Sequence, residues 1–172
     1  MVLSWQTAPM TPRTHSDSIV VARAAHEVYG MIADVTRMGE YSPVCAACWW
    51  DDGDGPVVGA HFTGRNVLPE RTWETRSEVV AADPGREFAW IVGPRIARWG
   101  YTFTAVDGGT EVVESWELLP EADAIYEERY GDAAATAADR YEKAVSGIPE
   151  TLAAIKRAAE SGPGSAPEGQ PA

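Results

Sequence analysis

Glu114 occupies the position in this sequence that most favours acid–base chemistry. Along residues 110–118 the even positions are more apolar than the odd ones, so a β-strand here turns its even face, and Glu114 with it, toward the interior. An ionised carboxylate buried without partners costs several kcal/mol, and Glu114 must therefore be paired, protonated or in contact with cavity water. Without a partner its pKa rises toward neutrality, where it can act as a general acid or base. The alternative is a structural ion pair with Arg65, Arg76 or Arg98.

Aromatic side chains supply a second candidate site, one suited to an apolar or aromatic small molecule. The chain has seven Trp, six Tyr and three Phe, and alternation along the expected strands gathers many of these rings on one face. Rings with a few polar groups between them are typical of a small-molecule pocket, whereas rings that pack only on one another form an ordinary core. The expected ligand-binding residues are Tyr41, Phe62, Asn66, Trp73, Thr75, Phe88, Trp90, Trp99, Tyr101, Phe103, Trp116, Leu152 and Ile155.

Several of these positions leave alternatives open. Tyr41 is placed at the mouth of the pocket by its position alone, as is Tyr130. Asn66 can hydrogen-bond a ligand carbonyl or hydroxyl, or it can satisfy a turn at a strand end. Trp49 and Trp50 are neighbours, so only one of them can point inward, and the sequence does not decide which.

Cys45 and Cys48 form a Cys-x-x-Cys motif in a segment that is predicted to be a strand. Three-residue spacing puts strand side chains on opposite faces, so the two thiols are expected to be unlinked. A redox pair normally needs a helix N-terminus, and a zinc site needs two more ligands. The string that begins at His26 lacks the second His of a zinc-protease motif, because Gly30 stands in its place. The sequence therefore predicts neither a metal site nor a cofactor.

The elements that must position these residues follow from apolar periodicity and turn signals. A strand over 18–22 leads into a helix over 24–35 and a short helical turn over 36–40. A long Ala-rich helix is expected over 132–160, with an apolar stripe that includes Leu152 and Ile155 and a kink or restart near Pro149. Between them, turn signals separate six strands, expected over 44–50, 60–67, 72–82, 88–92, 96–106 and 111–119.

Consecutive strands joined by short turns imply an antiparallel meander, and an amphipathic helix needs the apolar face of that sheet. The expected fold is α+β, a helix-grip fold with a seven-stranded curved antiparallel sheet wrapped around a long C-terminal helix and two short helices between strands 1 and 2. The domain is expected over 16–160, with flexible tails at 1–15 and 161–172, which are rich in Pro, Gly, Ser and Thr.

Composition limits the classes of function. The 172 residues carry a formal net charge of −12, which repels phosphate backbones and anionic lipid surfaces, so nucleic acid is not an expected partner. No apolar run approaches the roughly 20 residues needed to cross a bilayer, and no membrane insertion is expected. The two Cys and the absence of a secretory signal favour a cytoplasmic location.

Four segments give the sequence a family resemblance. They are ADVTRMGEYSP at 33–43, VVGAHFTGRN at 57–66, GGTEVVESW at 108–116 and TLAAIKRAAE at 151–160. Together with the order of elements, they resemble the START and Bet v 1-like (SRPBCC) superfamily, and most of all its polyketide cyclase/dehydrase-like branch. The resemblance implies a deep cavity between the sheet and the C-terminal helix. Members of the superfamily act as lipid or polyketide carriers, as aromatase/cyclases, and occasionally as resistance proteins that bind a toxic natural product.

The function expected first is therefore a carrier or sequestering protein for an apolar or aromatic, polyketide- or lipid-like molecule. The alternative is a cofactor-free aromatase/cyclase that uses general acid–base catalysis in the same cavity. A third class, a module that binds a partner protein, is supported only by the acidic surface. A general base on the cavity face favours the enzyme, whereas an all-apolar cavity favours the carrier. The ligand, the oligomeric state and the question of turnover are left open by the sequence.

Overall fold

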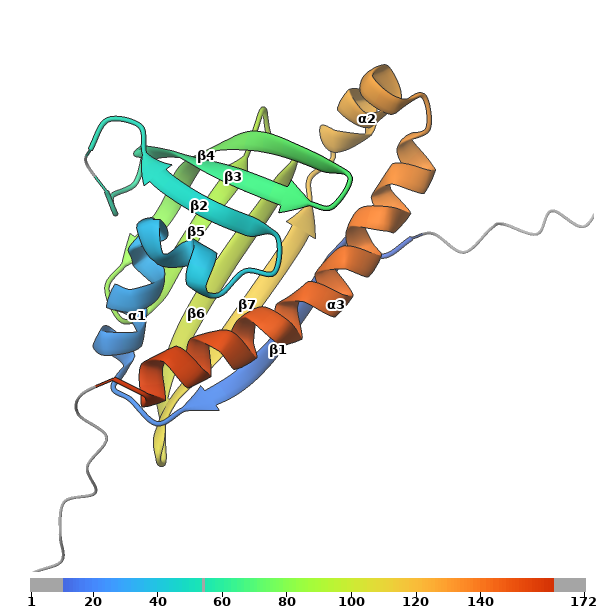
Figure 1. Cartoon of the computed structure of the whole chain (residues 1–172). Helices are drawn as coiled ribbons and strands as arrows, with labels where there is room; N and C mark the ends of the chain where they lie inside the picture. Colours follow the sequence, from blue (N-terminus) through green and yellow to red (C-terminus); the bar gives the residue numbers. More distant parts are fainter. Residues whose placement is uncertain (1–10, 54, 163–172) are drawn as a thin grey trace, which may run out of the picture.

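A seven-stranded antiparallel sheet and a long C-terminal helix form the protein, as the computed structural model in Figure 1 shows for residues 11–53 and 55–162. The strand order is β1-β7-β6-β5-β4-β3-β2, and every neighbouring pair is antiparallel. The elements are β1 (Thr14–Val21), α1 (Ala25–Ala33), η1 (Val35–Glu40), β2 (Cys45–Trp50), β3 (His61–Leu68), β4 (Arg71–Asp83), β5 (Glu87–Val92), β6 (Ala97–Val106), β7 (Gly109–Leu118), α2 (Ala122–Tyr130) and α3 (Ala133–Glu160). This is the expected helix-grip fold.

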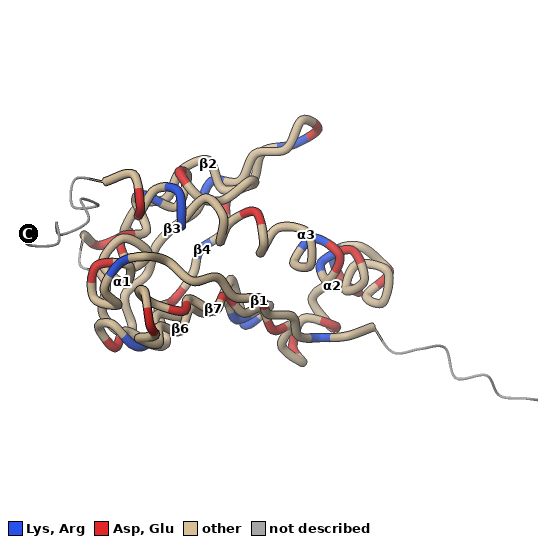
Figure 2. Tube along the Cα trace, turned by 90° about the horizontal axis from the view of Figure 1, so that it is seen from below, with Lys and Arg blue, Asp and Glu red and all other residues tan. Residues whose placement is uncertain are grey.

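The sheet curves so that its two ends face each other. Figure 2 places β2, β3 and β4 on one side and β1, β6 and β7 on the other, with acidic and basic residues interspersed along the trace. Helix α3 packs on β1 and β7 and buries its apolar stripe there, including Ile148, Leu152 and Ile155. Among the described residues, no helix is both long enough and apolar enough to span a bilayer.

Helix α3 runs from Ala133 to Glu160 with Pro149 inside it, so of the kink or restart expected there, the restart is not formed. Proline removes one backbone hydrogen bond from a helix, but the buried residues Ile148 and Leu152 on either side hold this segment against the sheet. In the same turn, the Thr151 hydroxyl donates to the Gly147 carbonyl at 3.0 Å. Tertiary packing therefore outweighs the local preference at Pro149.

At its N-terminal end the domain extends beyond the expected boundary at residue 16. Strand β1 begins at Thr14, inside the segment expected to be a tail. Arg13 just before it pairs with Asp123 at 2.9 Å and donates to the Leu119 carbonyl at 2.8 Å. Helix α2, which contains Asp123, was not expected as a separate element; it ends at Gly131, whose φ of 72° closes the helix with a left-handed residue. Most of both expected tails, residues 1–10 and 163–172, lies outside the described residues.

A β-bulge interrupts the pairing of β2 with β3 between Cys45 and Ala47. The 3₁₀ turn η1 lies directly against this bulge: a Cβ added to Gly39 would clash with the Ala46 carbonyl oxygen. Any larger side chain at this position must therefore move one backbone away from the other.

We expect Gly39→Ala to lower the free energy of unfolding by about 1 to 3 kcal/mol, because the added methyl group is forced against backbone atoms. The matched control is Gly30→Ala in the exposed part of α1, where an added Cβ meets nothing within 4 Å. That variant should gain about 0.5 to 1 kcal/mol from helix propensity. Urea unfolding of both variants measures the two effects, and equal stabilities would contradict the close approach of η1 to β2.

Candidate functional site

Glu114 lies on the buried face of β7, as its alternation predicts. Every even residue from Thr110 to Leu118 is buried, and the odd ones are not. Glu114 is 3% exposed and stands between Val112 and Trp116. Across the strand pair it lies directly opposite Tyr101 of β6.

The ion pair considered as the alternative for Glu114 is not formed. Each of the three candidate arginines pairs with a different carboxylate on the other face of the sheet. The pairs are Arg65 with Glu74 at 2.9 Å, Arg76 with Asp51 at 2.7 Å and Arg98 with Glu87 at 2.6 Å. Glu114 is thus a buried carboxyl without a cationic partner among the described residues.

Burial raises the pKa of Glu114 to about 8, and the hydrogen bond from the Tyr101 hydroxyl offsets only part of this effect. The pKa of Tyr101 is raised by burial, by Glu114 and by Tyr41. Burial likewise raises the pKa of Tyr41 to about 12. At neutral pH, therefore, Glu114 is mostly a neutral acid that can donate as well as accept a hydrogen bond.

Tyr41, Tyr101 and Glu114 together are called the polar node below. Two of its buried polar atoms, the Tyr41 hydroxyl and Oε2 of Glu114, have no hydrogen-bond partner in the described part of the chain. Buried polar groups are normally satisfied by protein, water or ligand. The node is thus able to offer a bound molecule two hydrogen-bonding groups.

A cluster of rings surrounds the buried face of β5. Trp90 lies at its centre, with ring centroids 5.7 Å from Phe62, 5.7 Å from Phe88 and 6.0 Å from Tyr101. Sequence analysis missed Tyr29 of α1, which packs edge-on against both Phe88 and Phe103. The only sequence feature that pointed to a buried Tyr29 was its place beside the apolar helical stripe of Val28 and Ile32. These rings contact one another, as in the core interpretation of the aromatic set.

The predicted ligand-binding residues fall into two groups. Nine of them are buried in one continuous core: Tyr41, Phe62, Phe88, Trp90, Tyr101, Phe103, Trp116, Leu152 and Ile155. Trp99 packs against that core while remaining partly exposed. The other three, Asn66, Trp73 and Thr75, are half-buried on β3 and β4 outside the core cluster.

Contacts at the β2–β4 end involve three of the positions that the sequence left open. Asn66 donates to the Thr75 hydroxyl at 3.3 Å, so its amide already has a partner within the sheet. Trp50 packs edge-on against Phe62 with centroids 5.6 Å apart and is the inward-facing member of its pair. Trp49 instead lies under the Arg65 guanidinium, 5.3 Å from the ring centroid.

The expectation that Cys45 and Cys48 lie on opposite faces is wrong. Their Sγ atoms are 3.3 Å apart, and both residues are buried. The β-bulge between Cys45 and Ala47 adds one residue to β2, and this shift turns both thiols to the same side. The two thiols are free, with no bond between the sulfurs.

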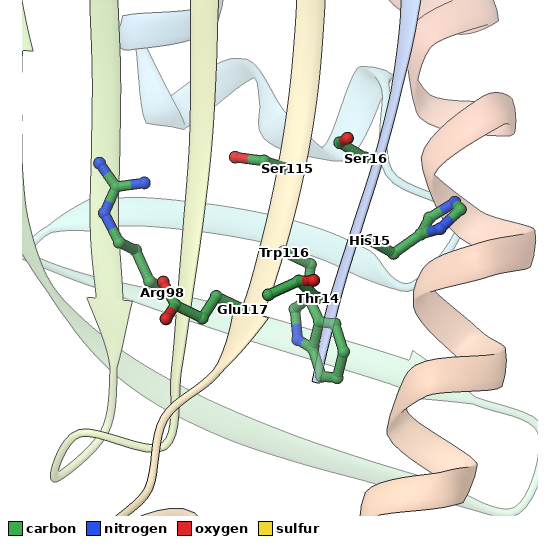
Figure 3. A pocket seen from close by; sticks show the side chains of 7 residues that line it. All are labelled: Thr14, His15, Ser16, Arg98, Ser115, Trp116 and Glu117. Atoms are coloured by element: carbon green, nitrogen blue, oxygen red, sulfur yellow. The ribbon is translucent and has the colours of Figure 1, made fainter. Parts of the chain in front are cut away.

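Two surface pockets are lined by different sets of residues. One, of about 440 Å³, is lined by residues of β1, β6 and β7, and Figure 3 shows Arg98 and His15 on opposite sides of it. The other, of about 460 Å³, lies between the β3–β4 turn and helices α2 and α3. Tyr130, expected at a pocket mouth, lines this second opening together with Arg71 and Arg140.

Comparison with known proteins places these features in a family. The family of polyketide cyclases/dehydrases and lipid transport proteins matches residues 13–160. A polyketide-cyclase-like protein from Corynebacterium glutamicum, solved by NMR, is 49% identical, with a TM-score of 0.64 over 86% of this chain and 91% of that one. No curated protein matches the sequence.

More distant solved structures share the fold. The di-domain ARO/CYC protein StfQ of the steffimycin pathway is 18% identical, with a TM-score of 0.65 over 86% of this chain and 50% of that one. Ara h 8.0201 is 14% identical, with a TM-score of 0.61 over 87% of this chain and 98% of that one. Given the family match over most of its length and the close Corynebacterium relative, the chain belongs to the polyketide cyclase/dehydrase and lipid transport family of the SRPBCC superfamily.

Proposed function

We propose that this protein binds an apolar or aromatic small molecule, polyketide- or lipid-like, between the concave face of the sheet and helix α3, as a carrier or sequestering protein. The observation that carries the proposal is a buried aromatic cluster that ends at a polar node with two unpartnered atoms. Such a combination, largely apolar with a few convergent polar groups, is what a small-molecule site requires. The family description, which names both polyketide cyclisation and lipid transport, supports the same class of ligand.

The polar node predicts one feature of the ligand. Neutral Glu114 can donate a hydrogen bond to a carbonyl oxygen, and its Oε2 atom or the Tyr41 hydroxyl can accept one from a ligand hydroxyl. A ligand with a carbonyl or phenol at one end of a planar apolar body would satisfy both the rings and the node. A purely aliphatic ligand would leave the two buried polar atoms unpartnered, at a cost of about 1 to 3 kcal/mol each.

The opening between the β3–β4 turn and helix α3 is the proposed route of entry. Glu70 of the turn and Arg71 at the start of β4 line it together with Tyr130 and Arg140. Because the rings of the cluster touch one another, a ligand must displace some of them, and its binding should change the environment of several Trp side chains at once.

We expect a planar hydroxylated probe such as a polycyclic phenol to quench the Trp fluorescence saturably and to raise the melting temperature, since it binds the folded state alone. Tyr41→Phe removes one hydrogen bond to the probe and should weaken binding about 3- to 10-fold. The control is Tyr130→Phe. The Tyr130 hydroxyl lies on the exposed rim of the entrance, so its removal should leave the affinity for the probe within about twofold of that of the parent chain. If no probe changes either signal, the protein has no accessible aromatic site.

A cofactor-free aromatase/cyclase is the second candidate function, and the pKa of Glu114 favours it. A carboxyl with a pKa of about 8 is close to neutrality, where a group can both take and return a proton in one cycle. In an aldol closure, the base removes the proton alpha to one carbonyl, a C–C bond forms at a second carbonyl, and that oxygen gains a proton.

A further inference from the structure

Three sulfur atoms meet where η1 lies against β2. Sγ of Cys45 is 3.3 Å from Sγ of Cys48, and the latter is 3.8 Å from Sδ of Met38. Both cysteines are 7% exposed, and Met38 is partly buried against the core. No step of the proposed function uses these atoms.

The backbone is built around this cluster at two glycines. Gly39 allows η1 to approach the bulge at Ala46, as described above, and so brings the Met38 side chain to the thiols. Gly64 of β3 lies on the other side of the thiols: a Cβ there would stand 3.2 Å from Sγ of Cys48 and 3.5 Å from Sγ of Cys45. The space occupied by the sulfurs therefore depends on two positions that carry no side chain.

We propose that Met38, Cys45 and Cys48 form a binding site for one soft monovalent cation, Cu(I). Two thiolates and a thioether are the ligand set that selects Cu(I) over harder ions. A thioether would contribute nothing to a disulfide, so the third sulfur favours metal binding over thiol oxidation as the use of this pair. The binding step releases two protons: the Cu(I) ion and two thiols give a bis-thiolate complex with the thioether as third ligand, and no electron is transferred.

The surroundings disfavour the commoner zinc ion. Structural zinc takes four nitrogen or sulfur ligands, and residues 11–53 and 55–162 contain no group of three or more His, Cys, Asp or Glu that could hold a metal.

The test uses the reduced full-length chain, kept free of oxygen and titrated with the coloured Cu(I) complex of bicinchoninate. The protein should withdraw one equivalent of Cu(I), seen as loss of the complex's colour, and should develop near-ultraviolet absorption from thiolate-to-copper charge transfer. Zn(II) offered at the same concentration should not displace it. Cys48→Ser should weaken Cu(I) binding by more than about 100-fold, since it removes a direct ligand.

Met38→Leu tests the third sulfur without removing a thiol. It conserves side-chain volume and should weaken Cu(I) binding about 10-fold. The matched control is Met31→Leu in α1, another half-buried methionine packed on the core, which should bind Cu(I) like the parent chain. Melting curves recorded without metal check that each variant is folded.

Three results would overturn the proposal. They are failure of the reduced protein to compete with bicinchoninate, Cu(I) binding that survives Cys48→Ser, and equal affinities for the Met38→Leu and Met31→Leu variants. A loss of two mass units on exposure to glutathione disulfide, in a chain that does not compete for Cu(I), would instead assign the pair to disulfide chemistry. Failure of the phenol titration would leave this proposal intact, because the two sites share no residue.

Discussion

Trp90→Ala should lower the free energy of unfolding by about 3 to 5 kcal/mol, the range for deleting a large buried aromatic side chain. Trp90 is 6% exposed and is in ring contact with Phe62, Phe88 and Tyr101. Its removal takes contacts from three strands at once and leaves a cavity at the centre of the cluster. Urea unfolding followed by far-ultraviolet circular dichroism measures the loss.

The matched control is Trp73→Ala. Trp73 was predicted to line the same site, but it lies outside the core cluster, with the Arg71 guanidinium 4.2 Å above its ring centroid. Its removal should cost about 1 kcal/mol or less. Indole should bind the cavity in Trp90→Ala and restore part of its melting temperature, with no such effect on Trp73→Ala. Similar losses in the two variants would mean that Trp90 is not the centre of the core.

Period-two alternation predicted the buried face correctly where the sheet is regular. In β6 and β7 each residue pairs with its partner without a shift, so parity alone placed both Tyr101 and Glu114 inward. In β2 the bulge changes the parity between Cys45 and Cys48, and no residue type in that segment predicts the bulge. A local irregularity of one residue was therefore enough to reverse the prediction for the thiols.

The same alternation also indicates that Glu114 has no arginine partner. Arg65, Arg76 and Arg98 occupy the parity opposite to that of their inward-facing neighbours, and the structure pairs all three with carboxylates on the outer face. What the sequence could not supply is contact between distant elements. Tyr29 reaches the aromatic cluster from α1, and Met38 reaches the thiols from η1. The direction of these two elements depends on how they pack on the sheet.

Stability should fall with rising pH because of Glu114, and Glu114→Gln should abolish that part of the dependence. The pKa of this carboxyl rises from an ordinary value of 4.5 to about 8 on folding, so between these values the folded state binds the proton more strongly than the unfolded state does. The stabilising contribution of Glu114 is fully present below about pH 4.5 and is lost as the pH rises to about 8. The slope is about 1.4 kcal/mol per pH unit over that window.

Gln is close in shape to a protonated Glu and cannot ionise. Near about pH 5 the two chains should therefore be similarly stable, while near about pH 8 the variant should be the more stable by several kcal/mol. Glu117→Gln, at an exposed position of the same strand, is the control and should follow the parent chain. Urea unfolding across this pH range compares the three. Parallel curves for parent and Glu114→Gln would contradict the raised pKa.

The same variant separates a structural from a functional role for the carboxyl. If Glu114 serves only to partner Tyr101, Glu114→Gln changes the pH dependence of stability and leaves the affinity for a phenolic probe unchanged. If Glu114 binds the ligand, Glu114→Gln changes the affinity for the phenolic probe about 3- to 10-fold, which is the effect of one hydrogen bond. If it transfers protons, turnover of a polyketone substrate falls by about 100-fold or more, while binding of the product persists, because Gln can hydrogen-bond the ligand but cannot take up or release the proton.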